Sequence, residues 1–323
     1  MSQVPPPATD PSSTPVVPVC YRHPKRETYL RCVRCDRPIC PECLREAPVG
    51  FQCPECVAEG RRTVRQGRTI FGGSTRGGEG YVTRALIAIN VAVLVISVAT
   101  LATASQSRGV GRALFFGSTP LTEWGSVWGI ARLGDSAGRV VGQVPVGIAD
   151  GEYYRIITSM FIHYGLVHLA LNMWALWVLG RELEAALGPG RFLTLYMFAG
   201  IGGSVAAYVF SPAAQSAGAS GAIFGLFAAL FVVLRRLNRD TSSIITVLVI
   251  NLIFSFSVAG ISWAAHVGGL ATGGALAVAI AYAPREMRTR VFVAALVGMA
   301  LILGAAIVLE TASINAMPVP PGF

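Results

Sequence analysis

Seven long apolar segments dominate the chain after residue 80, and they constrain its fold more than any other feature. Each is close to the ~20 residues that a helix needs to cross the hydrocarbon core of a bilayer. The segments cover residues 82–103, 160–180, 192–211, 219–234, 243–259, 262–282 and 291–309. Only 13% of the residues are charged, against about 25% in a typical soluble domain. The sequence therefore predicts an all-α polytopic membrane protein.

Arginines in the loops predict how the chain crosses the membrane. Arginine-rich loops precede the first segment and separate the second from the third, the fourth from the fifth, and the sixth from the seventh. The short loops 212–218 and 259–261 carry no charge, and the long loop 104–159 is mixed in sign. The positive-inside rule then puts the N-terminus in the cytoplasm and the C-terminus outside, and we expect the plasma membrane. This topology explains the formal net charge of +9 better than nucleic-acid binding does.

Polar residues on three of the segments are expected at the same depth. In this topology the second, fourth and sixth segments all run from outside to inside. Ser220 begins the fourth segment, His266 lies about one turn into the sixth, and the outer half of the second carries His163, His168 and Asn172. Polar side chains are costly inside a membrane and commonly mark function there. We therefore expect these five side chains to lie close together near the outer surface.

Glycine spacing provides a way for two of these segments to meet. Gly221 and Gly225 are four residues apart on the fourth segment, as are Gly269 and Gly273 on the sixth. Small residues at this spacing let helix backbones approach closely, which would bring the serine hydroxyl within hydrogen-bond reach of the histidine. Such a pair is the minimal activated nucleophile. None of the seven segments contains Asp or Glu, so we expect a Ser-His dyad rather than a triad.

Plainer interpretations of the same residues remain open at this point. A lone serine in a membrane helix usually bonds back to a carbonyl of its own helix. Three histidines could also bind a metal ion. However, His163 and His168 are five residues apart and face different ways, and the chain has no His-Glu-x-x-His pattern of a metalloprotease.

Several sequence elements, in order, resemble the rhomboid family of intramembrane serine proteases over about residues 82–283. Glu152-Tyr153-Tyr154-Arg155 is similar to the aromatic-Arg element of the family's first loop, although the family usually has Trp before the Arg. The family's His-x4-His-x3-Asn pattern is matched by His163, His168 and Asn172, its Gly-x-Ser-Gly by Gly218-Ala219-Ser220-Gly221, and its Ala-His-x-x-Gly by Ala265-His266-Val267-Gly268-Gly269. Each element is weak alone, but the ordered set is specific.

The resemblance implies a rhomboid-like six-helix core, residues 81–283, followed by a seventh transmembrane helix and tail, residues 284–323. It implies that Ser220 is the nucleophile and His266 the general base and acid. His168, Asn172 and the backbone N–H of Ser220 would form the oxyanion hole, with His163, Gly218 and Gly221 as neighbours. Many members stack a Tyr on the catalytic His, and Phe224 occupies that position here. The implied reaction is acyl transfer that cleaves transmembrane substrates near the outer side of the bilayer.

The N-terminal part of the chain carries eight potential zinc ligands. They form four pairs, Cys20-x2-His23, Cys32-x2-Cys35, Cys40-x2-Cys43 and Cys53-x2-Cys56. Eight ligands serve two tetrahedral zinc ions, with no cysteine left over. A cytoplasmic location disfavours disulfides. The segment, residues 20–57, looks like a B-box-type zinc finger, whose cross-braced order would join the first pair to the third and the second to the fourth. A sequential order is the alternative.

The flanking segments and the finger's role are predicted from composition. Residues 1–19 are rich in Pro, Ser and Thr and are expected to be disordered, and residues 58–80 form a basic linker. We expect the finger to bind a cytoplasmic protein partner or to regulate the protease, because no DNA-reading helix is recognisable. Two other functions compete with the protease: a catalytically inactive rhomboid-like protein that binds membrane helices, and a transporter. The segments lack the internal repeat and acidic residues expected of a transporter.

Overall fold

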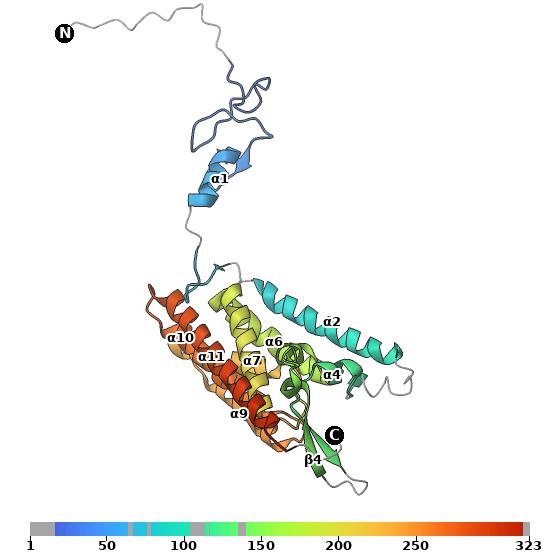
Figure 1. Cartoon of the computed structure of the whole chain (residues 1–323). Helices are drawn as coiled ribbons and strands as arrows, with labels where there is room; N and C mark the ends of the chain where they lie inside the picture. Colours follow the sequence, from blue (N-terminus) through green and yellow to red (C-terminus); the bar gives the residue numbers. More distant parts are fainter. Residues whose placement is uncertain are drawn as a thin grey trace, which may run out of the picture. The chain divides into compact units, whose positions relative to one another are not determined.

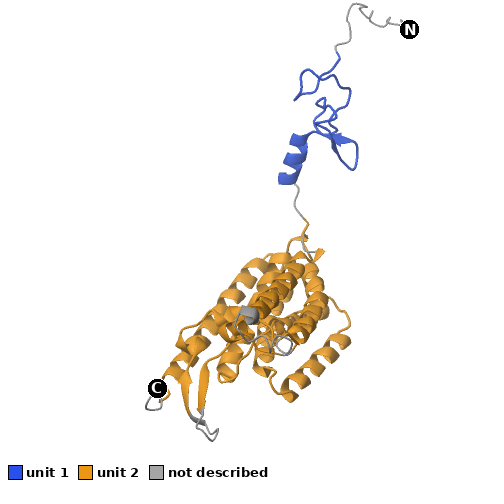
Figure 2. Cartoon of the chain, turned by 90° about the vertical axis from the view of Figure 1, so that its right-hand side faces the viewer, with its two compact units in different colours: residues 1–66 blue, residues 67–323 orange. Residues whose placement is uncertain are grey.

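The computed structural model describes residues 17–63, 67–75, 79–103, 114–115, 117–134 and 140–318. The chain divides into two compact units, residues 1–66 and 67–323 (Figure 2). Most of the predicted disordered tail, residues 1–16, lies outside the described residues, as does part of the predicted linker. Those two assignments and the other domain boundaries stay predictions.

The first unit is small and built around its cysteines. It contains the hairpin of β1 (Arg45–Glu46) and β2 (Phe51–Gln52), followed by α1 (Pro54–Thr63). The buried residues of its core cluster are six cysteines and one other apolar residue, Ile39. A core this small supplies little hydrophobic stabilisation, so such units usually depend on metals or disulfides.

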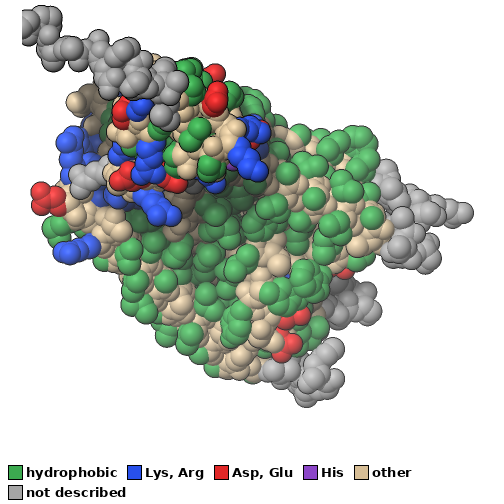
Figure 3. Space-filling model, turned by 90° about the horizontal axis from the view of Figure 1, so that it is seen from above, with side chains coloured by type: hydrophobic (Ala, Val, Ile, Leu, Met, Phe, Trp, Pro, Cys, Tyr) green, Lys and Arg blue, Asp and Glu red, His purple; other side chains and the backbone are tan. Residues whose placement is uncertain are grey.

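Seven apolar helices form the second unit, as the hydropathy pattern predicts (Figure 1). They are α2 (Tyr81–Thr103), α6 (Leu166–Leu187), α7 (Pro189–Phe210), α8 (Ser220–Arg236), α9 (Ser242–Ser257), α10 (Trp263–Tyr282) and α11 (Arg288–Asn315). Four of them, α2, α7, α10 and α11, are each long and apolar enough to cross a bilayer by length and composition. Large hydrophobic side chains are exposed over this unit (Figure 3), which is expected of a surface that faces lipid. The predicted helical membrane fold is confirmed.

Helices α7, α8 and α10 form the centre of the bundle. α8 packs against α10, α7 and α6, and α10 also packs against α7. The remaining helices are more peripheral: only 6% of the apolar stretch of α11 is fully buried, and the only buried side chain of α9 is Ser255. The central helices therefore carry the rigid part of the fold.

The second predicted segment differs from the observed helix. Instead of one helix from residue 160, α5 (Arg155–Thr158) and the 3-10 helix η4 (Ser159–Phe161) precede α6 and meet it at an angle of 89°. The break is made at Gly165, whose φ of +89° suits glycine and ends any continuous helix. His163 consequently lies in the turn before α6, not on the helix itself.

The long loop before α5 has structure that periodicity did not predict. It contains α4 (Pro120–Gly125), the antiparallel strands β3 (Ile130–Gly134) and β4 (Val140–Pro145), and the 3-10 helix η3 (Gly147–Asp150). The hairpin is short and partly polar, so its alternation is too brief to stand out in the sequence.

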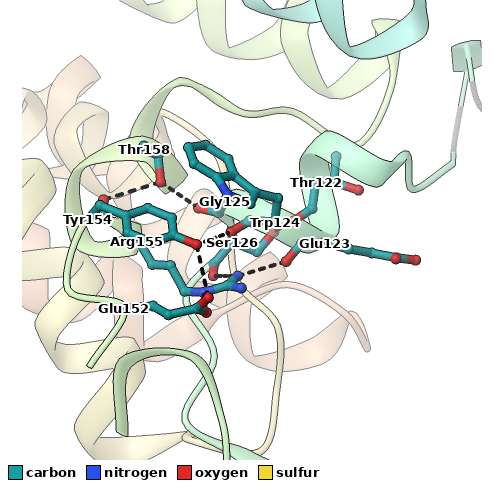
Figure 4. Close-up of polar contacts among 9 residues, drawn as sticks. All are labelled: Thr122, Glu123, Trp124, Gly125, Ser126, Glu152, Tyr154, Arg155 and Thr158. Carbon is teal, nitrogen blue, oxygen red and sulfur yellow. Dashed lines mark hydrogen bonds and ion pairs between the residues drawn. The ribbon is translucent and has the colours of Figure 1, made fainter. Parts of the chain in front are cut away.

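A buried arginine joins α4 to α5 (Figure 4). Arg155 is 7% exposed; its Nε donates to Glu152 at 2.6 Å, and one terminal nitrogen donates to the carbonyls of Glu123 at 2.7 Å and Ser126 at 3.0 Å. Tyr154 stacks on Trp124 with ring centroids 4.7 Å apart. The Tyr-Arg pair therefore holds the loop to the bundle, with Tyr154 in the place of the expected Trp.

Residues 67–75, within the predicted basic linker, contact the helical unit. Phe71 is 1% exposed and belongs to the main core cluster of the helical unit. Arg288 donates to the carbonyl of Ile70 at 2.5 Å, and Arg191 donates to the carbonyl of Phe71. These contacts pin the segment to the ends of α7 and α11.

Candidate functional site

Ser220 and His266 lie within hydrogen-bond distance. Ser220 is the first residue of α8, and His266 is in the first turn of α10, where it is 7% exposed. The Oγ of Ser220 is 2.9 Å from Nε2 of His266. The geometry agrees with the predicted pairing of a hydroxyl and its base; the catalytic roles themselves stay a prediction.

Glycines bring the backbones of α8 and α10 into contact beside this pair. A Cβ at Gly269 would collide with the backbone oxygen of Gly221, and a Cβ at Gly273 would collide with the Cα of Gly225. The interface is thus the one that the four-residue spacing indicates. Because backbone packs directly on backbone, the separation of the two polar side chains is set by the main chain.

Phe224 supplies an aromatic face to the histidine. It is one turn after Ser220, and its ring lies 4.1 Å from that of His266, centroid to centroid, at an angle of 12°. The stack restricts rotation of the imidazole. A phenyl ring can therefore take the positioning role that the family usually gives to tyrosine.

His168 and Asn172 lie in the first two turns of α6, and the imidazole of His168 approaches Gly218. The backbone N–H of Tyr164 donates to Nδ1 of His168 at 3.3 Å, so a neutral His168 carries its proton on Nε2. A Cβ at Gly218 would be 2.8 Å from that Nε2 and 3.7 Å from the Oγ of Ser220. The absence of a side chain at residue 218, where φ is +129°, lets the imidazole of His168 lie close to the backbone beside Ser220.

Asn172 contacts His168, and His163 contacts the residue before Ser220. The amide nitrogen of Asn172 donates one bond to the carbonyl of His168 at 2.9 Å, and an amide has a second N–H to offer. Nε2 of His163 accepts from the backbone N–H of Ala219 at 3.4 Å. His163 therefore contacts the residue before Ser220 and is not directed at the serine hydroxyl.

Ser255 is a site residue that sequence reasoning missed. Its Oγ lies 2.6 Å from Nδ1 of His266, and it is 3% exposed. The available signal was weak: Asn251 and Ser255 are polar residues four apart on the fifth apolar segment, which places them on one helical face. A serine in such a helix is usually interpreted as bonding only to its own backbone.

Comparison with known proteins decides the family. A family model described as "Rhomboid domain" matches residues 150–283. GluP of Bacillus subtilis, named as a rhomboid protease, is 47% identical over 131 residues, which are 39% of this chain and 26% of GluP. YdcA of the same organism, named as a putative rhomboid protease, is 40% identical over 134 residues, 40% of this chain and 67% of YdcA. This chain belongs to the rhomboid family.

The match extends beyond bacteria and leaves the N-terminus outside it. The mitochondrial RHOMBOID-like protein 6 of Arabidopsis thaliana is 30% identical over 149 residues, 43% of this chain and 47% of that protein. The chain thus spans about a quarter of GluP, two thirds of YdcA and half of the plant protein. The rhomboid domain contains every residue of the candidate site described above, and the cysteine-rich unit precedes it.

The cysteine-rich unit contains two clusters that could hold metal ions. One groups Cys20, His23, Cys40 and Cys43, and the other groups Cys32, Cys35, Cys53 and Cys56, with the ligand atoms of each within 4.8 Å of one another. Tetrahedral zinc with Zn–S bonds of ~2.3 Å spaces its sulfurs by ~3.8 Å, and the Sγ atoms of Cys35 and Cys53 are 3.8 Å apart. The grouping is cross-braced, first pair with third and second with fourth. All seven cysteines are free thiols.

Backbone N–H groups lower the pKa of two of these thiols. Burial raises the pKa of the Cys32 thiol, but backbone N–H groups around it, including that of Cys53, outweigh burial and lower the pKa to about 6. Cys20 is lowered to about 6 in the same way. Metals bind the thiolate form, so each cluster contains one cysteine that favours it. Burial and the neighbouring sulfurs raise the pKa of Cys43 to about 11 and also raise that of Cys56.

Proposed function

We propose that this chain is an intramembrane serine endopeptidase that cleaves transmembrane proteins near the outer side of the bilayer with a Ser220–His266 dyad. The observation that carries the proposal is the 2.9 Å contact between Oγ and Nε2 inside a rhomboid domain whose relatives are named as proteases. A buried imidazole that touches a serine at a helix N-terminus has little use as a packing group. It is well suited to activate the hydroxyl.

In the proposed reaction, Oγ of Ser220 attacks a peptide carbonyl and its proton passes to Nε2 of His266. The carbonyl oxygen becomes an oxyanion in the space beside Gly218. It accepts hydrogen bonds from the backbone N–H of Ser220, from Nε2–H of His168 and from the second amide N–H of Asn172. His266 then gives the proton to the leaving amine, and water hydrolyses the acyl-enzyme.

The position of the site favours substrates whose transmembrane helix unwinds easily near the cleaved bond. Ser220 and His266 both lie in the first turn of their helices, close to the loops at that end of the bundle. An intact substrate helix bonds its own carbonyls internally, so the scissile bond must unwind before it can be attacked. Gly or Pro near the outer end of the substrate helix lowers that cost.

Orientation and metal content are part of the same proposal. The arginine-rich loops support a plasma-membrane protein with a cytoplasmic N-terminus and an outer C-terminus. Each cysteine cluster would bind one structural zinc ion, which supplies stability to a unit with little core. The unit would act as a binding module for a cytoplasmic partner.

The test is cleavage of single-pass substrates co-expressed with the full chain, comparing wild type with Ser220→Ala. Ser257→Ala is the matched control, because Ser257 is an exposed serine near the end of α9. We expect cleavage by wild type and the control, and none by Ser220→Ala. A fluorophosphonate probe should label the same two proteins only. Cleavage that persists in Ser220→Ala, or binding of membrane helices without cleavage or labelling, would favour the inactive rhomboid-like alternative.

A further inference from the structure

Ser255 is buried and contacts His266, but it has no part in the reaction proposed above. It is the only buried side chain among the sixteen residues of α9, and it points at the histidine of the proposed dyad. His266 makes two side-chain hydrogen bonds, one from each ring nitrogen: Nε2 to Ser220 and Nδ1 to Ser255. In a neutral imidazole one nitrogen donates and the other accepts, so the direction of the second bond decides which nitrogen is free to take a proton.

A second contact of Ser255, to a residue one turn earlier in α9, determines the direction of its bond to His266. The Oγ of Ser255 is 2.7 Å from the carbonyl oxygen of Asn251. A carbonyl only accepts, so the single hydroxyl proton of Ser255 is used in that bond. Toward His266 the serine oxygen can then only accept, which requires the proton of the neutral ring to be on Nδ1. Nε2 is left with a lone pair directed at the hydroxyl of Ser220.

We infer that Ser255 is a positioning residue that holds His266 in the tautomer needed for a general base. The inference rests on the proposed Ser220–His266 dyad and deepens it. When Nε2 takes the proton of Ser220, the ring becomes an imidazolium and its Nδ1–H donates to Ser255. That hydrogen bond strengthens because the donor is now charged. In this chain, a hydroxyl that is itself held by a backbone carbonyl takes the place that a carboxylate occupies in a triad.

The matched pair of variants is Ser255→Thr and Ser255→Val. Thr and Val have nearly the same shape, and both add a methyl group, so any cost of packing is common to the two. Only Thr keeps a hydroxyl, and in a helix that hydroxyl can still bond to the carbonyl four residues before it. We expect Ser255→Val to lower kcat about 10- to 100-fold relative to Ser255→Thr, with KM unchanged.

A spectroscopic measurement reports the tautomer without relying on activity. The chain has only four histidines, so 15N labelling of histidine gives few ring signals, and a His266→Gln variant assigns the relevant ones. We expect the Nδ1–H tautomer of His266 in wild type and Ser255→Thr, and a shift toward Nε2–H in Ser255→Val. Equal kcat in the two variants, or a tautomer that does not respond to them, would overturn the inference. If the tautomer shifts in Ser255→Val as expected but wild type does not cleave, the proposed protease function would be overturned instead.

A separate observation concerns four arginines at the opposite end of the bundle. They surround an open pocket of about 360 Å³ and are Arg68, Arg191, Arg285 and Arg288. Among the described residues that line this pocket none is acidic, and none of the four makes an ion pair in the described part of the chain. Glu286 follows Arg285 in sequence but does not line the pocket. Four like charges thus converge without compensation.

Hydrogen bonds hold two of the four arginines of this pocket in place. Arg191 and Arg288 are held by the carbonyls of Phe71 and Ile70, so their guanidinium groups are fixed in place. Each still has further N–H groups to donate. The pocket also opens beside the first turn of α11, a helix whose apolar stretch is exposed or half-buried and has few fully buried residues. An arrangement of fixed guanidinium groups beside a lipid-facing surface suits a phosphate group.

We propose that this pocket binds the phosphate of an anionic group, supplied by a lipid headgroup or by free phosphate. The probe variant is Arg68→Gln/Arg285→Gln, because both side chains are exposed and neither makes a hydrogen bond that holds residues 67–75 in place. Arg239→Gln, an exposed arginine that does not line the pocket, is the control. Native mass spectrometry of the full chain would be titrated with phosphatidylglycerol or phosphatidylcholine, and thermal unfolding followed with inorganic phosphate.

We expect phosphatidylglycerol, and not phosphatidylcholine, to remain bound to wild type and to the control. The double variant should bind it at least about tenfold more weakly. If only inorganic phosphate stabilises wild type and loses its effect in the double variant, the source is free phosphate and the proposed chemistry still holds. Binding of either anion that is equal in the double variant, or no binding of either, would overturn the proposal.

Discussion

The rings of Phe224 and His266 lie 4.1 Å apart, centroid to centroid, and within 12° of parallel. The imidazole is thereby held from its face by one aromatic ring and from its two nitrogens by Ser220 and Ser255. Three contacts from two neighbouring helices, α8 and α9, leave a single side-chain orientation.

Replacing Phe224 should separate stacking from hydrogen bonding. Phe224→Leu removes the aromatic face but keeps an apolar side chain, and we expect the cleavage rate to fall about three- to tenfold, the usual value of an aromatic pair. Phe224→Tyr keeps the face and should stay near the wild-type rate. Steady-state cleavage of a fixed substrate measures both. A Leu variant as fast as wild type would show that the stack does not matter for the rate.

The glycine contact between α8 and α10 should not tolerate a methyl group. Gly269→Ala places a Cβ against the backbone oxygen of Gly221, so the helices must move apart, at a cost of about 1–3 kcal/mol or more. Activity should be lost with stability, because the same shift separates Ser220 from His266. Gly298→Ala is the control, since a Cβ there meets nothing within 4 Å. Thermal unfolding in detergent and probe labelling would show whether the two variants differ as expected.

Arg155 should be irreplaceable by lysine. Its guanidinium reaches Glu152 and two carbonyls at once, a geometry that a single ammonium group does not reproduce. Arg155→Ala removes the donor from these acceptors, of which the carbonyl of Ser126 is buried, and we expect a loss of about 2–3 kcal/mol in the free energy of unfolding, with Arg155→Lys recovering less than half of it. The exposed Arg132 provides the comparison, and Arg132→Ala should change little. Similar stability of all three variants would contradict this account.

We expect the chain to bind two zinc ions. Only the N-terminal unit should need them for its stability. Elemental analysis of the purified chain should give about two zinc ions, and Cys53→Ser should lose at least one of them. A chelator should unfold residues 20–57, seen as rapid proteolysis there, while the helical unit keeps its melting temperature. Glu59→Gln, on the surface of α1, should retain both ions. Full protection of the chelated unit against protease would refute a structural role for the metal.

Much of the membrane domain was predictable from residue patterns, because lipid imposes simple rules. Hydropathy located all seven helices, and glycines at a four-residue spacing indicated the α8–α10 contact. The break before α6 was not predictable: Ile162 and the residues around it are as apolar as a helix interior, so hydropathy continues across a bend that one glycine conformation creates. Composition likewise did not indicate that residues 67–75, within the predicted basic linker, contact the helical unit through the buried Phe71.

Some residues of the candidate site were likewise predictable from the sequence, and others were not. Ser220, His266, His168 and Asn172 were identified because polar groups in apolar helices are conspicuous and fit a known pattern. Ser255 was not, because its significance depends on which helix lies across from it. Only a three-dimensional arrangement distinguishes a serine that bonds solely to its own carbonyl from one that also accepts from a histidine. Similarly, spacing alone left two orders of zinc ligation open, and the packing of the four pairs distinguished them.

The interleaved order of the metal ligands has a consequence for synthesis of the chain. The first cluster is complete only when Cys43 has been made, and the second only at Cys56, yet the span between the first cluster's two halves already contains half of the second. Each proposed ion would close a loop that contains half of the other cluster, and the first cluster could fill before Cys53 is made. All eight ligands nevertheless precede Tyr81, where the first membrane helix begins. The N-terminal unit can therefore mature on the ribosome before the translocation machinery meets a hydrophobic segment.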